Sequence, residues 1–187
     1  MAKKKKAKKD MTKLVANIVI IALAVLTICT LFMPVINSAT VATKIGTGAT
    51  GMELISAAFA SEASLDMSAG TALLYGYKIA EETAFVTTVF MWAYMLTIAV
   101  SVASIVFAVL NILGMKFKMV NTILGAALAL LALVTFIFGI VVASKNTAVT
   151  EVLGVESGIR TVISVGIYML LGTLIAGGTE VYLAKRK

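Results

Sequence analysis

Long stretches without charge dominate this chain and alternate with short charged segments. Four of them cover residues 14–36, 83–115, 119–144 and 161–184, the last interrupted only by Glu180. Each exceeds the roughly 18 to 20 residues that an α-helix needs to cross about 30 Å of hydrocarbon. Because backbone groups that face lipid find no water to bond, such segments span a membrane as helices. We therefore expect an all-α membrane protein built on a four-helix transmembrane bundle.

Composition agrees with lipid as the solvent. Apolar residues make up 60% of the chain and charged ones only 13%, against about 25% charged in a typical soluble domain. The chain has no His, and its one Cys, Cys29, lies inside an apolar stretch, which removes most metal and nucleophile chemistry. The central parts of the four stretches carry none of the ionisable groups that relays and intramembrane enzymes use. We expect no enzymatic activity, cofactor, metal site or small-molecule substrate.

The charge distribution predicts orientation. The tail at residues 1–13, the turn at 116–118 and the tail at 185–187 are rich in lysine, whereas the segments at 37–82 and 145–160 taken together hold more acidic than basic residues. Under the positive-inside rule both termini are then cytoplasmic. The first stretch could also begin a secretory signal, but its length favours a retained span.

The basic tail is expected to contact anionic lipids of the inner leaflet, at about 1 kcal/mol for each lysine near the surface. Nucleic-acid binding is not expected, because no aromatic reader accompanies the lysines. The lysines concerned are Lys3, Lys4, Lys5, Lys6, Lys8, Lys9 and Lys13.

The second stretch is longer than a bilayer requires, since its residues would form a helix of about 50 Å. Trp92 and Tyr94 are side chains of the kind that favours the membrane–water boundary. If they mark the outer interface, residues 83–91 project from the membrane. This projection would provide a wall against which the first outer loop can pack.

The first outer loop, residues 37–82, is too long for a simple connection and contains recurring apolar residues. We expect it to fold into a small extracellular α/β cap. The β-branched residues predict a strand over 38–45 and a second over 71–79. Thr50 and Glu53 have the spacing of a capping box, which predicts a helix over 52–60.

The cap helix is expected to form a lid over the outer end of the bundle, or else a contact surface for a neighbouring subunit. The second strand would place both of its tyrosines on one side. The candidate contact residues are Leu54, Ile55, Phe59, Tyr75 and Tyr77.

Small residues at four-residue spacing let helices approach closely in a membrane. They predict packing within the bundle, an oligomer interface, or both. Candidates with this spacing are Ala99 and Ala103 in the second stretch and Gly125 and Ala129 in the third. The fourth stretch is unusually rich in glycine, and its candidates are Gly166, Gly172, Ala176 and Gly177.

Polar side chains within the stretches fall toward their cytoplasmic ends. For these residues we expect hydrogen bonds between helices, with an ion vestibule as the alternative. They are Asn17, Asn111, Asn121 and Glu180.

The layout of four spans, cytoplasmic termini, a long folded first outer loop and a short second one resembles the claudin-like and large-pore-channel topology. It is also similar to small four-span proteins of Gram-positive bacteria, in which a Thr-Gly-x-x-Leu stretch like the one at residues 50–54 follows the first span. This resemblance implies a bacterial plasma membrane. Claudins carry a Gly-Leu-Trp motif and two cysteines in the first loop, and connexin-type channels carry loop cysteines. None is present here, so neither junction sealing nor docking carries over.

Three functional hypotheses remain open. The first is a structural or scaffolding protein that associates with itself, as a homo-oligomer, or with a partner through helix faces and the cap. The second is an oligomeric channel whose pore is lined by Thr- and Ser-bearing helix faces. The third is an accessory subunit of a transporter or secretion complex.

Overall fold

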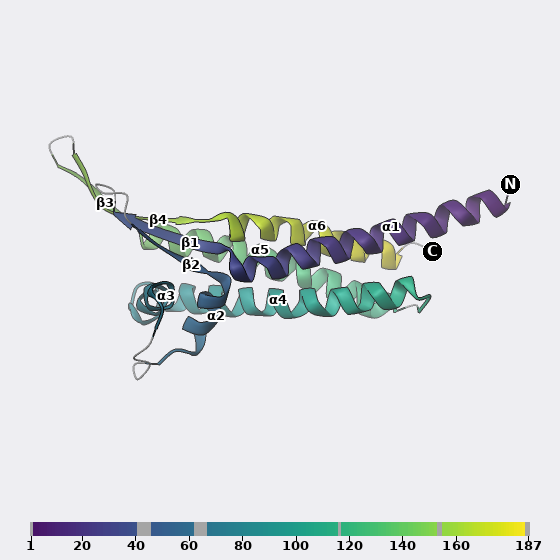
Figure 1. Cartoon of the computed structure of the whole chain (residues 1–187), viewed down its shortest axis with the longest axis horizontal. Helices are drawn as coiled ribbons and strands as arrows, with labels where there is room; N and C mark the ends of the chain where they lie inside the picture. Colours follow the sequence, from purple (N-terminus) through teal and green to yellow (C-terminus); the bar gives the residue numbers. More distant parts are fainter. Residues whose placement is uncertain (1, 41–45, 62–66, 116, 153–154, 186–187) are drawn as a thin grey trace.

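The computed structural model describes residues 2–40, 46–61, 67–115, 117–152 and 155–185, with side chains described outside residues 2–10 and 149–157. Helices dominate, and a small sheet gathers at one end (Figure 1). In chain order the elements are α1 (Ala2–Cys29), a 3₁₀ turn (Thr30–Phe32), β1 (Pro34–Thr40), β2 (Gly46–Thr50), α2 (Gly51–Phe59), α3 (Ala69–Ile79), α4 (Ala84–Ile112), α5 (Lys118–Lys145), β3 (Ala148–Val152), β4 (Val155–Ile163) and α6 (Val165–Lys185).

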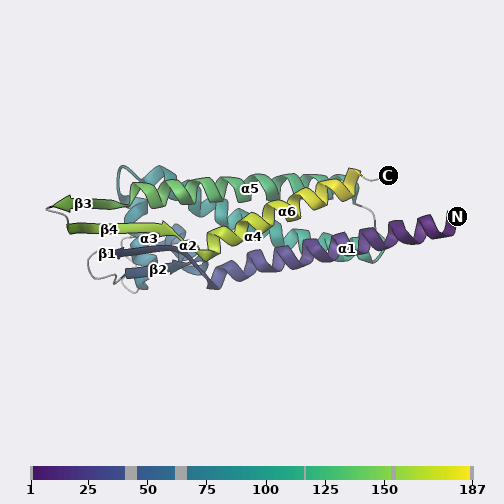
Figure 2. The same ribbon diagram turned by 90° about the horizontal axis from the view of Figure 1, so that it is seen from above.

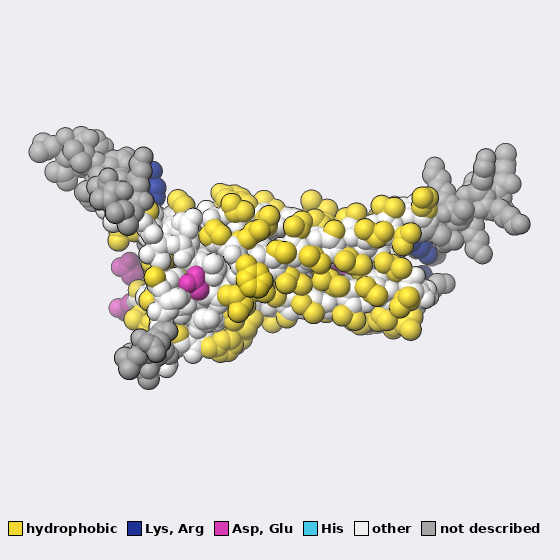
Figure 3. Space-filling view, viewed as in Figure 1, with side chains coloured by type: hydrophobic (Ala, Val, Ile, Leu, Met, Phe, Trp, Pro, Cys, Tyr) yellow, Lys and Arg dark blue, Asp and Glu magenta, His cyan; other side chains and the backbone are white. Residues whose placement is uncertain are grey.

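Four helices are long and apolar enough to cross a membrane, as expected: the segments Met11–Phe32, Ala84–Ile112, Lys118–Lys145 and Val165–Lys185. They run side by side along the long axis (Figures 1 and 2), and we call them the helical body. Contacts join α1 to α4, α4 to α5, α5 to α6 and α6 to α1, so the four close into a ring. On the face seen in Figure 3, their outward surface is largely hydrophobic.

Both chain ends lie at one end of the helical body, which we call the lysine end because Lys13, Lys118 and Lys185 lie there (Figure 1). The strands, α2 and α3 gather at the opposite end, which we call the sheet end. Acidic side chains are visible at the sheet end in Figure 3.

The first helix stops where the sequence cannot continue it. Pro34 lacks a backbone N–H and disfavours helical geometry in the residue before it. Met33 is accordingly extended, at φ −102° and ψ 150°. Pro34 then opens β1. The expectation that Pro34 ends the first span is confirmed, with a 3₁₀ turn between the helix and the strand.

The sheet has four strands in the order β2-β1-β4-β3, all antiparallel to their neighbours. In the central pair, Ser38 lies opposite Thr161. The sheet therefore unites the connection that follows α1 with the connection that precedes α6. We predicted a cap from the first loop alone, and this is corrected: β3 and β4 come from the second. Residues 161–163, assigned to the fourth span for their lack of charge, belong to β4, and α6 starts at Val165.

The predicted helix of the first loop is confirmed as α2. The Thr50 side chain accepts a hydrogen bond from the Glu53 backbone N–H, and the Glu53 carboxylate accepts one from the Thr50 N–H. This reciprocal pair satisfies donors that the first turn of a helix leaves free. The predicted strand over 38–45 is seen as β1 up to Thr40, and residues 41–45 lie outside the described part of the chain.

The predicted strand over residues 71–79 is wrong, because this segment is the helix α3. Ser68 caps it by accepting a hydrogen bond from the Thr71 N–H. Helical geometry also places Tyr75 and Tyr77 on different sides. The Tyr75 ring lies under the Lys78 ammonium, 5.7 Å from its centroid, whereas Tyr77 packs against the core.

Of the two aromatic residues expected at the outer interface, Trp92 is exposed and Tyr94 is not. Tyr94 is fully buried, and its hydroxyl is 2.8 Å from the Thr30 hydroxyl. Trp92 is 46% exposed and packs edge-to-face on Phe59 of α2. Side chains two positions apart on a helix point in different directions. Of the two rings, only that of Trp92 can therefore lie at a membrane–water interface. The first turns of α4 do form a wall, against which α2 and α3 pack.

Candidate functional site: the sheet platform

Thr161 of β4 is the hub of the sheet end. Its side-chain oxygen donates to the Asn146 carbonyl at the end of α5, at 2.9 Å. The same oxygen lies 3.1 Å from the Ser38 hydroxyl on β1 and 3.2 Å from the Tyr77 hydroxyl on α3. Thr147 donates to the Thr161 carbonyl and accepts from its N–H. One buried threonine thus joins β4, β1, α3 and α5.

The sheet continues into the helical body without a flexible linker. Ser164, between β4 and α6, donates its N–H to the Val35 carbonyl and accepts a bond from the Asn37 amide. Gly166 in the first turn of α6 lies so close to β1 that a Cβ there would be 2.9 Å from the Pro34 carbonyl oxygen. We call the four strands with α2 and α3 the sheet platform, since they are fixed to α1, α4, α5 and α6 together.

Glu53 links the starts of the two platform helices. Its carboxylate accepts hydrogen bonds from the Ser68 hydroxyl at 2.6 Å and from the Thr50 N–H and hydroxyl at 2.8 and 3.0 Å. Partial burial acts to raise the pKa of the Glu53 carboxyl. The bonds from Ser68, Thr50 and the Gly70 backbone outweigh it, so this pKa lies below its usual 4.5.

Acid should therefore loosen the platform helices. A lowered folded-state pKa means that the ionised carboxylate contributes stability at pH values above the unfolded pKa, and that this contribution is lost as the pH falls through the folded pKa. Below pH 4.5 we expect α2 to separate from α4. Trp92 fluorescence measures this separation, because the Trp92 ring packs on Phe59 of α2. Glu53→Gln should remove this part of the acid transition, and an unchanged pH profile in the variant would contradict the assignment.

The platform leaves two strand edges and several apolar side chains open. Within the described residues, β2 and β3 each have one neighbour, so each presents an edge. On β4, Ile159 is 47% exposed and Val162 is 45% exposed. Unpaired edges and exposed apolar residues together are features through which proteins bind other chains.

The predicted contact residues divide between core and surface. Leu54 is fully buried, and Ile55 and Tyr77 pack against the same core, so these three hold the platform together. Phe59 is 66% exposed apart from its contact with Trp92. The sequence missed Thr161 and Val162 because residues 161–163 looked like the start of a transmembrane helix, and it missed Ile159 because that residue fell in the predicted loop at 145–160. Their β-branched side chains were the available signal.

Among the predicted small residues, Gly125, Ala129 and Gly177 form the close crossing of α5 and α6. A Cβ added at Gly125 would lie 2.6 Å from the Gly177 carbonyl oxygen, and one at Gly177 would lie 2.9 Å from the Ala129 nitrogen. Ala176 is fully buried nearby. These residues and Gly166 are used within the chain. The four-residue spacing indicated Gly125 and Ala129, and the glycine-rich composition of the fourth stretch indicated Gly166 and Gly177.

Ala99 and Ala103 are not at the packing face of α4. Ala99 is exposed and Ala103 half-buried. The α4 residues that face the other helices are instead Ala93, Thr97, Ser101, Ser104 and Ala108. A packing role for Ala99 and Ala103 inside the chain is therefore wrong. Gly172 is half-buried, and a Cβ there would make ordinary contact with Leu23 at 3.4 Å.

Pairs of hydroxyl groups lie buried between the helices of the helical body, and we call them the polar seam. They could not be recognised from the sequence. Thr27 lies 2.7 Å from Thr173, joining α1 to α6, and Thr97 lies 3.2 Å from Thr135, joining α4 to α5. Ser104 donates to the buried Glu180 carboxylate at 3.3 Å, so Glu180 does bond between helices as expected.

The predicted lipid-binding lysines Lys3, Lys4, Lys5, Lys6, Lys8 and Lys9 have side chains outside the described part of the chain; Lys13 is described at the lysine end. In the residues described, no three His, Cys, Asp or Glu side chains are grouped as a metal site would require. No protein-family model, curated protein or solved structure matches this chain, so its geometry alone carries the functional argument.

Proposed function

We propose that this chain is a non-enzymatic scaffolding protein of the plasma membrane that self-associates through its sheet platform. One observation supports this proposal most strongly: the platform is fixed to all four long helices, yet it has two unpaired strand edges among the described residues and exposed apolar side chains on β4. A rigid surface loses little conformational freedom on binding, which favours association. The alternative is that the sheet platform binds a different protein instead of a second copy of this chain.

The proposed orientation places the lysine end in the cytoplasm and the platform outside. Lys13, Lys118 and Lys185 lie at the end that holds both termini. Excess lysine near the ends of membrane helices marks the cytoplasmic side. In this orientation the four long helices form a transmembrane bundle under an extracellular cap, a layout that resembles the claudin-like topology.

The polar seam favours a scaffold over a channel. A pore between subunits needs polar side chains on the outside of each bundle. Here Thr27, Thr97, Ser101, Thr135 and Thr173 are fully buried inside the chain. Their hydrogen bonds stay within the helical body, where each pair avoids an unsatisfied polar group.

The oligomeric state of the purified protein tests this proposal. We expect oligomers in mild detergent by light scattering, and Val162→Lys should shift them toward monomers because a charge would be buried at the contact. Ala80→Lys adds the same charge to an exposed site at the end of α3 and should leave the mass unchanged.

Two results would overturn self-association as the function. A ring with a central opening that conducts in planar bilayers would identify a channel. A monomer that copurifies with an unrelated membrane protein would identify an accessory subunit.

A further inference from the structure

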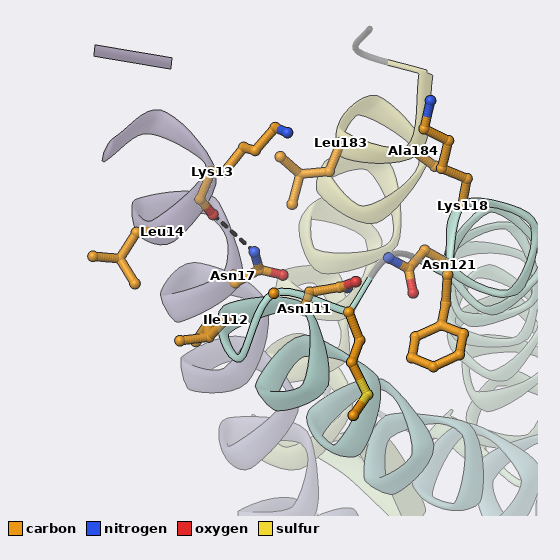
Figure 4. Close-up of a pocket in the computed structure, with 12 residues that line it drawn as sticks. Lys13, Leu14, Asn17, Asn111, Ile112, Lys118, Asn121, Leu183 and Ala184 are labelled. Carbon is orange, nitrogen blue, oxygen red and sulfur yellow. Dashed lines mark hydrogen bonds between the residues drawn. The ribbon is translucent and has the colours of Figure 1, made fainter. Parts of the chain in front are cut away.

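A cavity of about 320 Å³ opens at the lysine end, far from the sheet platform (Figure 4). All four long helices contribute to its walls. Asn17 comes from α1, Asn111 from α4, Asn121 from α5 and Leu183 from α6. Figure 4 shows the three asparagine side chains converging on the cavity. A polar cavity of this size, set between apolar helices, requires an explanation beyond helix packing.

Two of these asparagines carry oxygens without a partner. The side-chain oxygens of Asn17 and Asn121 are buried and accept no hydrogen bond from any described residue, and the two residues are only 5% and 7% exposed. The Asn17 amide nitrogen bonds the Lys13 carbonyl of its own helix, so the expected bond to another helix is not made. Leaving a buried acceptor unsatisfied destabilises the folded chain. A ligand with hydrogen-bond donors would recover this cost.

The cavity also has a charge pattern. Lys13 and Lys118 line it at the mouth (Figure 4). The unpartnered oxygens of Asn17 and Asn121 lie among the same lining residues. The site therefore combines positive charge at its mouth with buried hydrogen-bond acceptors. A phosphate followed by a group with hydroxyl donors fits this order.

The cavity borders the outward surface of two long helices, where lipids would lie. Leu14 of α1 and Ile112 of α4 line it, and they are 45% and 41% exposed. Exposed apolar residues on two long helices offer contacts for an acyl chain beside the polar cavity. A membrane lipid is thus favoured over a soluble phosphate compound.

We propose that this cavity binds the glycerol-phosphate headgroup of an anionic membrane lipid. The lysines Lys13 and Lys118 hold the phosphate, and the oxygens of Asn17 and Asn121 accept from the headgroup hydroxyls. This site does not depend on self-association, because it lies at the other end of the molecule.

Lipid retention by native mass spectrometry tests the proposal, using the full chain extracted from bilayers that contain phosphatidylglycerol, phosphatidic acid and phosphatidylcholine. We expect selective retention of phosphatidylglycerol, because phosphatidic acid lacks the headgroup hydroxyls and phosphatidylcholine lacks both hydroxyls and net charge. Asn17→Leu and Asn121→Leu should each lower retention about fivefold, the effect of losing one hydrogen bond. The double change Lys13→Gln, Lys118→Gln should lower it at least about tenfold.

The asparagine variants separate ligand binding from folding. In phosphatidylcholine alone, both should melt at or above the temperature of the parent, because leucine removes an unsatisfied buried oxygen. In phosphatidylglycerol, the parent should gain more stability than either variant. Lys145→Gln, a matched loss of charge at the sheet end, should retain the lipid fully.

Equal retention of phosphatidic acid and phosphatidylglycerol, or undiminished retention by the asparagine variants, would overturn the site. Displacement of the lipid by micromolar glycerol 3-phosphate would overturn the lipid as its source and assign the cavity to a soluble phosphate compound.

Discussion

Gly177→Val should force α5 and α6 apart and unfold the helical body at a much lower temperature than the parent. Any Cβ at this position meets the Gly125 carbonyl oxygen and lies 2.9 Å from the Ala129 nitrogen. Both are backbone atoms, so no side chain can rotate away and one helix must move. Overpacking of a core costs about 1 to 3 kcal/mol, and backbone clashes belong at the upper end. Thermal loss of helical circular dichroism in detergent measures the effect.

The neighbouring glycine supplies the matched control. A Cβ at Gly178 would meet nothing within 4 Å, so Gly178→Val should melt within a few degrees of the parent. The double variant Gly125→Ala, Gly177→Ala should also be less destabilised than the sum of its single variants, because one separation of the helices relieves both clashes. Equal melting temperatures for Gly177→Val and Gly178→Val would show that α5 and α6 do not cross at this point.

The long helices could be predicted because the length of an uncharged stretch is almost sufficient to identify them. A stretch without charge and of sufficient length has few other stable structures. The residues of the crossing could also be predicted, Gly125 from its spacing to Ala129 and Gly177 from the glycine-rich composition of its stretch. Yet the same rule selected Ala99 and Ala103, which are not at the packing face of α4. Small residues permit close approach without requiring it, and the buried face of α4 is instead marked by Thr97 and Ser101.

The sheet end could be predicted only in part, since its structure depends on contacts between distant segments. The capping box at Thr50 and Glu53 could be predicted because its two residues are only three positions apart in the sequence. The pairing of β1 with β4 joins residues more than a hundred positions apart, such as Ser38 and Thr161. Residues 71–79 show the opposite problem. Two tyrosines at alternate positions favour a strand locally, but the Ser68 cap and burial of Leu74 stabilise a helix.

Gly51→Val should detach α2 from the helical body while leaving the long helices folded. Gly51 opens α2 and is buried against the hydrogen-bonded pair of Thr30 and Tyr94. A Cβ there would lie 2.6 Å from the Thr30 carbonyl oxygen and 2.8 Å from Cζ of the Tyr94 ring. The ring is fully buried and has no room to withdraw, so α2 must move instead, at a cost of about 3 kcal/mol.

The only tryptophan of the chain, Trp92, reports this movement, because its ring packs on Phe59 of α2 at a centroid distance of 5.9 Å. Detachment removes that contact, so Trp92 should become more accessible to acrylamide while the helical circular dichroism changes little. Gly76→Val is the matched control: a Cβ at Gly76 meets nothing within 4 Å, and quenching should equal that of the parent. Unchanged quenching in Gly51→Val would mean that α2 does not rest on Tyr94. A platform loosened in this way should also lose self-association together with its rigidity, which ties the packing of one glycine to the proposed function.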